Sequence, residues 1–276
     1  MLVACLLPII FIFLSLFLQK KDGGSIEVTF LSRTHTDILR AIAMMLIILC
    51  HAASAAGAKV FTPVGGMAVA IFLILSGYGI TVSYMKNGLK HFWKKKITRI
   101  WLPYLLLLLV VAITGEYNGR MTPLNFSLDV LCLRTSYWFI SFLIYNYVLF
   151  FISHKVAALR RYKYTLFILF ALVIVIFDRH TEAEQCLSFV TGVWIAYNKE
   201  KAQKILLNPF LMISFLLITV IAFGLKQYTY IGEEMANNDL LNNVVYILIK
   251  FSFALFVIGL ISPPLIHRKC LIIKGL

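Results

Sequence analysis

The sequence predicts an all-α protein, a polytopic bundle of membrane-spanning helices, from three observations. Of the 276 residues, 61% are hydrophobic and only 14% are charged. The hydrophobic residues stand in long blocks, whereas the helices of a soluble domain need a polar face toward water. Several blocks approach or exceed the roughly 20 residues that cross a hydrocarbon core about 30 Å thick.

Nine segments of the chain fit a spanning helix. We expect these spans at residues 2–18, 38–56, 64–84, 99–115, 136–153, 164–178, 185–198, 208–225 and 241–262. The first segment has no basic n-region and no small-x-small cleavage site, so we interpret it as a span and not as a signal peptide. We see no linker long enough for a second domain. The sequence therefore predicts a single transmembrane domain over residues 1–276, without a soluble domain.

The basic residues of the loops predict the orientation of the chain. Of the 26 Lys and Arg residues, 20 fall in loops on one side and 5 on the other, with Lys250 inside the ninth span. An excess of Lys and Arg marks cytoplasmic loops. We therefore expect an integral protein of the inner or plasma membrane, with its N-terminus outside and its C-terminus in the cytoplasm. The loops account for the net charge of +14 without a nucleic-acid partner.

The five cysteines show no metal-ligand spacing, so the sequence predicts no metal site. We expect them to be small packing residues. A disulfide between Cys132 and Cys186, both near the outer face on this topology, stays open.

His51 is the only histidine within an expected span. An ionisable side chain at membrane depth is a functional candidate by default, and the alternative is a neutral histidine bonded to another helix. Arg40 precedes it by 11 residues. On one helix the two therefore share a face about 16 Å apart, and both can line one path. The alternative for Arg40 is snorkelling to the headgroups.

Two further clusters lie within the third expected span and after it. Ser76 and Gly77 are small enough to let a neighbouring helix or a ligand approach the backbone, and Tyr78 adds a polar tip. Lys96 and Arg99 are three residues apart and share a face if they are helical. They are either a clamp for the phosphates of a cytosolic anion or a positive-inside anchor.

Three residues stand near the expected outer face. Trp138 is typical of an interfacial aromatic belt. Glu182 and Glu184 precede the seventh span, where they would orient His51, bind a hydroxyl group or simply be solvated.

These motifs, in this order, resemble the acyltransferase-3 family of membrane O-acyltransferases. The family shows an Arg-x10-His pattern, a Phe-x-x-x-Ser-Gly-Phe/Tyr stretch and a basic-x-x-Arg-x-x-x-Pro segment. The matching positions are Arg40 and His51, 72–78, Lys96, Arg99 and Pro103, 138–140 and 189–192. The resemblance covers residues 35 to about 200. The family usually has about ten helices, the last with a Ser-Tyr-x-x-Tyr-x-x-His-like stretch, and we expect this chain to be truncated before it.

The resemblance implies transfer of an acyl group, commonly acetyl, from cytosolic acetyl-CoA or another acyl-CoA to a hydroxyl of a surface glycan or lipid-linked saccharide. The acyl-CoA is a co-substrate, and no bound cofactor is implied. His51 would be the general base or a transient acyl carrier. Donor-binding residues would be Arg40, Lys96, Arg99, Ser76, Gly77 and Tyr78, and residues on the acceptor side Glu182, Glu184 and Trp138.

Two other functions share part of this pattern. A transporter or flippase of an anionic lipid or saccharide would also have a basic inner surface and an intramembrane histidine. Transporters often show paired broken helices in related halves, and the sequence shows no such pair. A membrane scaffold in which His51 only packs is the third reading.

Overall fold

The structure, a computed structural model, describes residues 29–58, 62–114, 122–133, 137–177, 181–228 and 239–262. Within these ranges the regular elements are all helices, which confirms the predicted all-α class. Helices occupy eight of the nine expected positions, and the first expected span, 2–18, lies outside the described residues. The helices are α2 (Arg33–Ala55), α3 (Thr62–Asn87), α4 (Phe92–Lys96), η2 (Ile97–Trp101), α5 (Leu102–Ile113), α6 (Pro123–Val130), α7 (Trp138–Lys155), α8 (Ala157–Arg160), α9 (Lys163–Phe177), η3 (Ala183–Gln185), α10 (Ser188–Tyr197), α11 (Lys199–Leu206), α12 (Pro209–Tyr228) and α14 (Asp239–Leu260).

Five helical segments of the described chain are long and apolar enough to cross a membrane. They are Arg33–Ala55, Pro63–Asn87, Phe92–Ile113, Pro209–Lys226 and Leu240–Leu260. Such segments make the chain an integral membrane protein. The remaining expected spans, at α7, α9 and α10, are not among the five, so the count of nine is not confirmed.

The chain divides into two compact units, and each is described by itself. Unit 1 contains residues up to Thr81 and from Ala171 onward, and unit 2 contains Val82–Phe170. Unit 1 holds α2, most of α3, and α10 to α14. Unit 2 holds α4 to α8.

Helix α3 is the centre of unit 1. In its most apolar window, 61% of the residues are buried, against 22% for α2 and 17% for α12. Two of its glycines face α2, because a Cβ at Gly65 would lie 2.7 Å from Cys50 Sγ and one at Gly79 would lie 3.8 Å from Arg40 Nη2. These two contacts align α2 and α3 antiparallel.

Helices α3 and α10 cross at two glycines. A Cβ at Gly77 would overlap the carbonyl oxygen of Phe189, and a Cβ at Gly192 would overlap the carbonyl oxygen of Ile74. In a bilayer, where helices gain no hydrophobic driving force from association, such close backbone approach is a principal source of packing energy. This crossing fixes α10 against the middle of α3.

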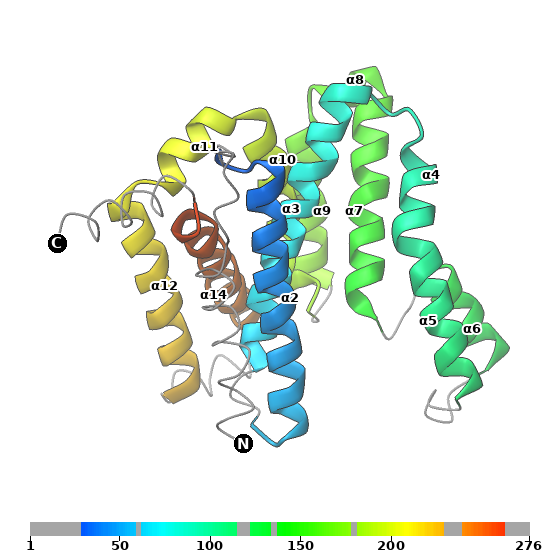
Figure 1. Ribbon diagram of the computed structural model, residues 1–276, viewed down its shortest axis with the longest axis horizontal. Helices are drawn as coiled ribbons and strands as arrows, with labels where there is room; N and C mark the ends of the chain where they lie inside the picture. The colour runs from blue at the N-terminus through cyan, green and yellow to red at the C-terminus, as the bar shows by residue number, and fades with distance from the viewer. Residues whose placement is uncertain are drawn as a thin grey trace, which may run out of the picture. The chain divides into compact units, whose positions relative to one another are not determined.

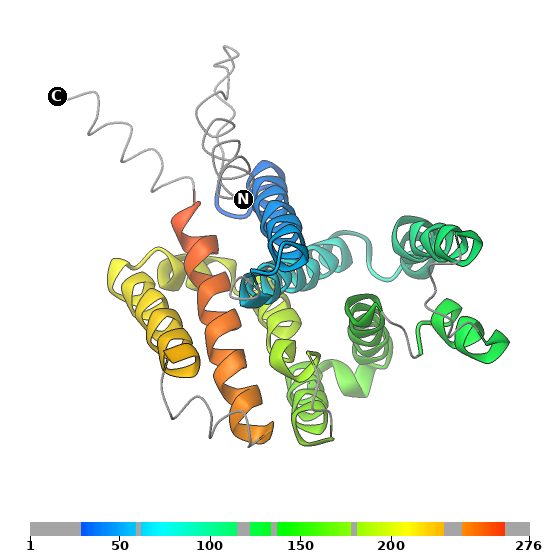
Figure 2. The same cartoon turned by 90° about the horizontal axis from the view of Figure 1, so that it is seen from below.

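Helices α9 and α10 are too short to span a bilayer alone. They contain 15 and 10 residues, about 22 Å and 15 Å of helix, against a hydrocarbon core about 30 Å thick. The turn at 181–187, which carries η3, directly precedes α10. Beyond α10 the chain continues into α11, α12 and α14, and α12 and α14 run side by side (Figures 1 and 2).

In unit 2, α4, η2 and α5 form one continuous helical column with α6 beside it (Figure 1). Trp101 Nε1 donates a hydrogen bond to the carbonyl of Val130 at 2.8 Å, and the Tyr104 hydroxyl donates to that of Asp129 at 3.1 Å. These bonds satisfy carbonyls at the C-terminal end of α6 that have no partner within the helix.

We expect Gly77→Ala and Gly192→Ala to lower the unfolding temperature of the detergent-solubilised protein. Each added methyl group overlaps a backbone carbonyl that cannot move unless α3 and α10 separate. Overpacking of this kind costs about 1–3 kcal/mol. Gly224→Ala is the matched control, because nothing lies within 4 Å of its Cβ position. Equal unfolding temperatures for all three variants would contradict the close backbone contact between α3 and α10 at these glycines.

Candidate functional site

Helix α2 carries the two residues of the Arg-x10-His pattern, as predicted. His51 is exposed and stands four residues before the C-terminal end of the helix at Ala55. Arg40 Nη1 donates to Asp37 Oδ1 at 2.8 Å and to Thr36 Oγ1 at 3.4 Å. The Arg40 side chain is 40% exposed, so it is held in place and still accessible to a ligand.

The chain enters α2 through a constrained turn. Leu31 has a positive φ of 52°, its N–H donates to His35 Nδ1 at 3.0 Å, and its carbonyl accepts from the Tyr78 hydroxyl at 3.0 Å. Tyr78, predicted to bind a donor, is buried and tethers the start of α2 to α3. This tether fixes the register of α2, and with it the position of Arg40.

Gly77 has a packing role in the structure. The sequence left open whether a helix or a ligand approaches it, and the backbone of Phe189 in α10 fills this space. Ser76 beside it is half-buried. The backbone of α10 therefore occupies the side of Gly77 on which a Cβ would stand.

Lys96 and Arg99 have different surroundings. Lys96 ends α4, and its Nζ lies 4.0 Å from the centroid of the Tyr147 ring. Arg99 lies within the π-helix η2 and is exposed. The expectation of a shared face assumed α-helical spacing, whereas a π-helix has more residues per turn. Of the three cations predicted to bind the donor, Arg40 belongs to unit 1, and Lys96 and Arg99 belong to unit 2.

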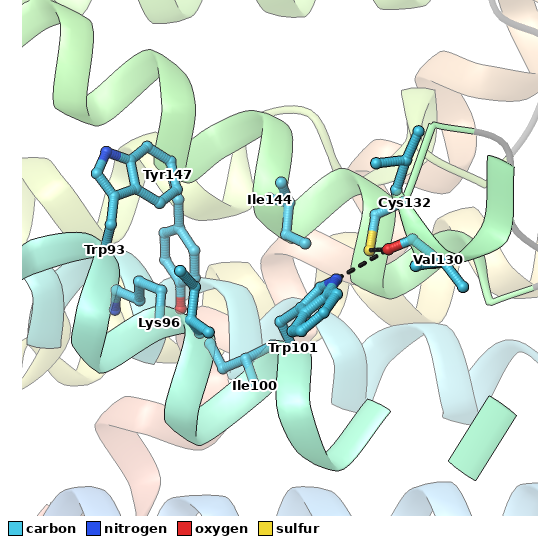
Figure 3. A pocket seen from close by; sticks show the side chains of 10 residues that line it. Trp93, Lys96, Ile100, Trp101, Val130, Cys132, Ile144 and Tyr147 are labelled. Atoms are coloured by element: carbon cyan, nitrogen blue, oxygen red, sulfur yellow. Dashed lines mark hydrogen bonds between the residues drawn. The ribbon is translucent and has the colours of Figure 1, made fainter. Parts of the chain in front are cut away.

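A cavity of about 320 Å³ lies beside Lys96, within unit 2. Its walls are mostly apolar and come from α4, η2, the end of α6, and α7. Figure 3 shows Lys96 and Tyr147 at one end, and Trp101, Val130 and Cys132 at the other. The volume falls in the range of small-molecule sites. An apolar cavity with one cation at its end suits a molecule with an uncharged arm and an anionic group.

The thiol in this cavity is not a nucleophile at neutral pH. Burial raises the pKa of Cys132 to about 11, and the nearby Asp129 carboxylate adds to the rise. The thiolate is the reactive form of cysteine. Cys132 and Cys186 are both buried free thiols, so the disulfide left open by the sequence is not formed.

Of the predicted acceptor-side residues, Trp138 lies in unit 2 and the two glutamates lie in unit 1. Trp138 begins α7 and is half-buried. Glu182 and Glu184 both lie in the turn at 181–187, ahead of α10. Glu184 has a partner that the sequence did not reveal, Lys250 of α14.

Glu184 and Lys250 form a buried ion pair. Their side chains are 11% and 5% exposed, and the Lys250 ammonium donates to the Glu184 carboxylate. Gln185 follows, and its Nε2 donates to the carbonyl of Gly66 at 2.7 Å. The signal in the sequence was Lys250, the single lysine inside the ninth span, but its partner stands 66 residues away. No group of three or more His, Cys, Asp or Glu suited to a metal ion occurs in the part of the chain that the structure describes.

Comparison with known proteins identifies a family. A family model described as an acyltransferase domain matches residues 35–276. No curated protein matches, and no solved structure matches. The matched region starts at His35 and includes α2, α3, the cavity and the ion pair.

We expect Lys250→Met and Glu184→Gln each to destabilise the protein. Each substitution removes one charge of a buried ion pair and leaves the opposite charge buried without its partner. Such losses cost about 3–5 kcal/mol. The double variant should unfold at a higher temperature than Lys250→Met alone, since both buried charges are gone. Lys86→Met, at an exposed lysine near the end of α3, controls for the loss of a cation. Additive effects in the double variant would show that the two side chains do not interact.

Proposed function

This chain belongs to the acyltransferase-3 family, and from that premise we propose that it moves an acyl group from cytosolic acyl-CoA to a hydroxyl of a surface glycan or lipid-linked saccharide. The coarser statement, that it is a membrane acyltransferase, follows from the family match and the apolar helices. The acyl group we propose is acetyl, the commonest in the family.

The observation that carries the proposal is the arrangement of α2. One helix holds a fixed cation, Arg40, near one end and an exposed imidazole, His51, near the other. The two lie about 16 Å apart along the axis. An imidazole takes up and releases a proton near neutral pH, which suits a general base. The ring is accessible in the structure, as a base that meets two substrates requires.

The proposed reaction balances without another reactant. The acceptor hydroxyl gives its proton to the His51 imidazole as its oxygen attacks the thioester carbonyl. The new C–O bond forms, the C–S bond breaks, and the imidazole returns the proton to the sulfur of CoA. A transient acyl-histidine is the variant of this route in which the ring attacks first.

The donor has anionic phosphates and a long uncharged arm, and two features of the protein suit these. Lys96 and Arg99 supply cations within unit 2. The cavity beside Lys96 has mostly apolar walls, and its volume of about 320 Å³ falls in the range of small-molecule sites. We therefore assign the uncharged arm to this cavity and not to the filled space beside Gly77.

We expect His51→Ala to abolish acyl transfer while membrane insertion and yield stay normal. His51 is exposed near the end of α2, so the change removes no buried contact. His91→Asn is the control, because His91 is exposed with a φ of 56°, a conformation that asparagine tolerates. Release of free CoA by purified protein, given acetyl-CoA and a hydroxyl acceptor, measures the reaction and separates it from transport. Normal CoA release by His51→Ala would end the proposed mechanism.

We expect Lys96→Gln to raise the KM for acetyl-CoA about tenfold, as the loss of one charged hydrogen bond would. Lys96→Arg should recover much of the affinity. Lys95→Gln, next to it in α4 and not part of the cavity wall, should leave this KM unchanged. If Lys95→Gln and Lys96→Gln raise the KM for acetyl-CoA equally, these lysines act only through the overall charge of the surface and not through a specific contact.

A further inference from the structure

Helix α14 has a polar face within its apolar sequence. Asn242, Tyr246 and Lys250 follow one another at intervals of four residues, so they lie on one side of the helix over about 12 Å. We call these three residues the α14 polar face. Val244 and Leu248, about 200° around the helix from Asn242 and Tyr246, are 42% and 44% exposed and suit contact with lipid.

The α14 polar face makes continuous contacts with a lysine of α12. Lys226 donates a hydrogen bond to Asn242 Oδ1, and its ammonium lies 4.2 Å from the centroid of the Tyr246 ring. The Lys250 ammonium lies 5.0 Å from the same centroid, so two cations flank one aromatic ring. Lys226, Asn242 and Tyr246 are only half-buried, whereas Lys250 is buried against Glu184.

Lys250 lies near the middle of α14, which is a candidate membrane span. Lys250 follows Asp239, the first residue of α14, by 11 residues, or about 16 Å of helix, half the thickness of a hydrocarbon core. Ionisable groups at this depth pair with one another or face a water-filled cavity. The ion pair accounts for Lys250 and Glu184. Lys226, Asn242 and Tyr246 contact one another and stay half-buried, so part of each side chain is open to a ligand.

Lys250 also connects the α14 polar face to the first turns of α3, which contact the His51 end of α2. The Lys250 side chain lies directly against Gly66 of α3, whose carbonyl accepts from Gln185. The preceding residue, Gly65, contacts Cys50, the chain neighbour of His51. Two adjacent residues of α3 therefore contact the α14 polar face on one side and the chain neighbour of His51 on the other.

We propose that the α14 polar face, together with Lys226 and Glu184, is the binding site of the saccharide acceptor. A sugar has an apolar ring face and many hydroxyl groups. The exposed part of the Tyr246 side chain can contact the former, while the Asn242 amide, the Lys226 ammonium and the Glu184 carboxylate form hydrogen bonds with the latter. Lys250 is the positioning residue that holds Glu184. The assignment rests on the proposed acyl transfer, and its first test is independent of activity.

The test is the reactivity of introduced cysteines toward a charged, membrane-impermeant methanethiosulfonate added to intact cells. Asn242→Cys and Tyr246→Cys should react about tenfold faster than Val244→Cys and Leu248→Cys, because the reagent meets ionised thiols only in water. The unsubstituted protein gives the background of the native cysteines. Equal rates on both faces of α14 would overturn the proposal, whatever the activity of the protein.

The second test separates binding of the acceptor from folding. In the CoA-release assay with the N-acetylglucosamine tetramer as acceptor, Tyr246→Leu and Lys226→Gln should raise the KM of the saccharide about tenfold and leave that of acetyl-CoA unchanged. A purely structural role would change both constants or the yield, and that result would overturn the proposal. Absence of CoA release by the unsubstituted protein contradicts the proposed function instead, while the labelling rates still decide whether water reaches the α14 polar face.

Discussion

The glycines of α3 determine how unit 1 is assembled. Gly65 and Gly79 admit α2, Gly66 admits the Lys250 side chain of α14, and Gly77 admits the backbone of α10. A bilayer provides no hydrophobic force to bring helices together, so close approach and dispersion contacts must do so. Because one helix supplies every one of these contacts, the arginine and histidine of α2, the ion pair and the turn before α10 all take their positions from it.

The sequence was sufficient for those features that depend on local periodicity. Long apolar blocks predict helices because a bilayer leaves no other way to satisfy the backbone, and a helix is found at each expected position in the described chain. The placing of Arg40 and His51 on one helix follows from its 3.6-residue period, and α2 confirms it. The resemblance drawn from a few ordered motifs is confirmed by the match over residues 35–276.

Features that depend on tertiary contacts could not be predicted in this way. The π turn at Ile97–Trp101 is a matter of hydrogen-bond pattern, which residue spacing does not determine, and it gives Lys96 and Arg99 different surroundings. The partner of Lys250 is Glu184, which the sequence predicts near the outer face, where it would orient His51, bind a hydroxyl group or be solvated. Gly77 could have faced a ligand or a helix, and only the structure places Phe189 there.

The ten residues of α10 have a consequence for the proposed acyl transfer. They cover about 15 Å, close to the roughly 16 Å between Arg40 and His51 along α2. A helix of this length reaches only about halfway across a hydrocarbon core about 30 Å thick. If the acyl group of the proposed reaction passes beside α10, the distance it travels is set by protein geometry and not by the length of the lipid chains.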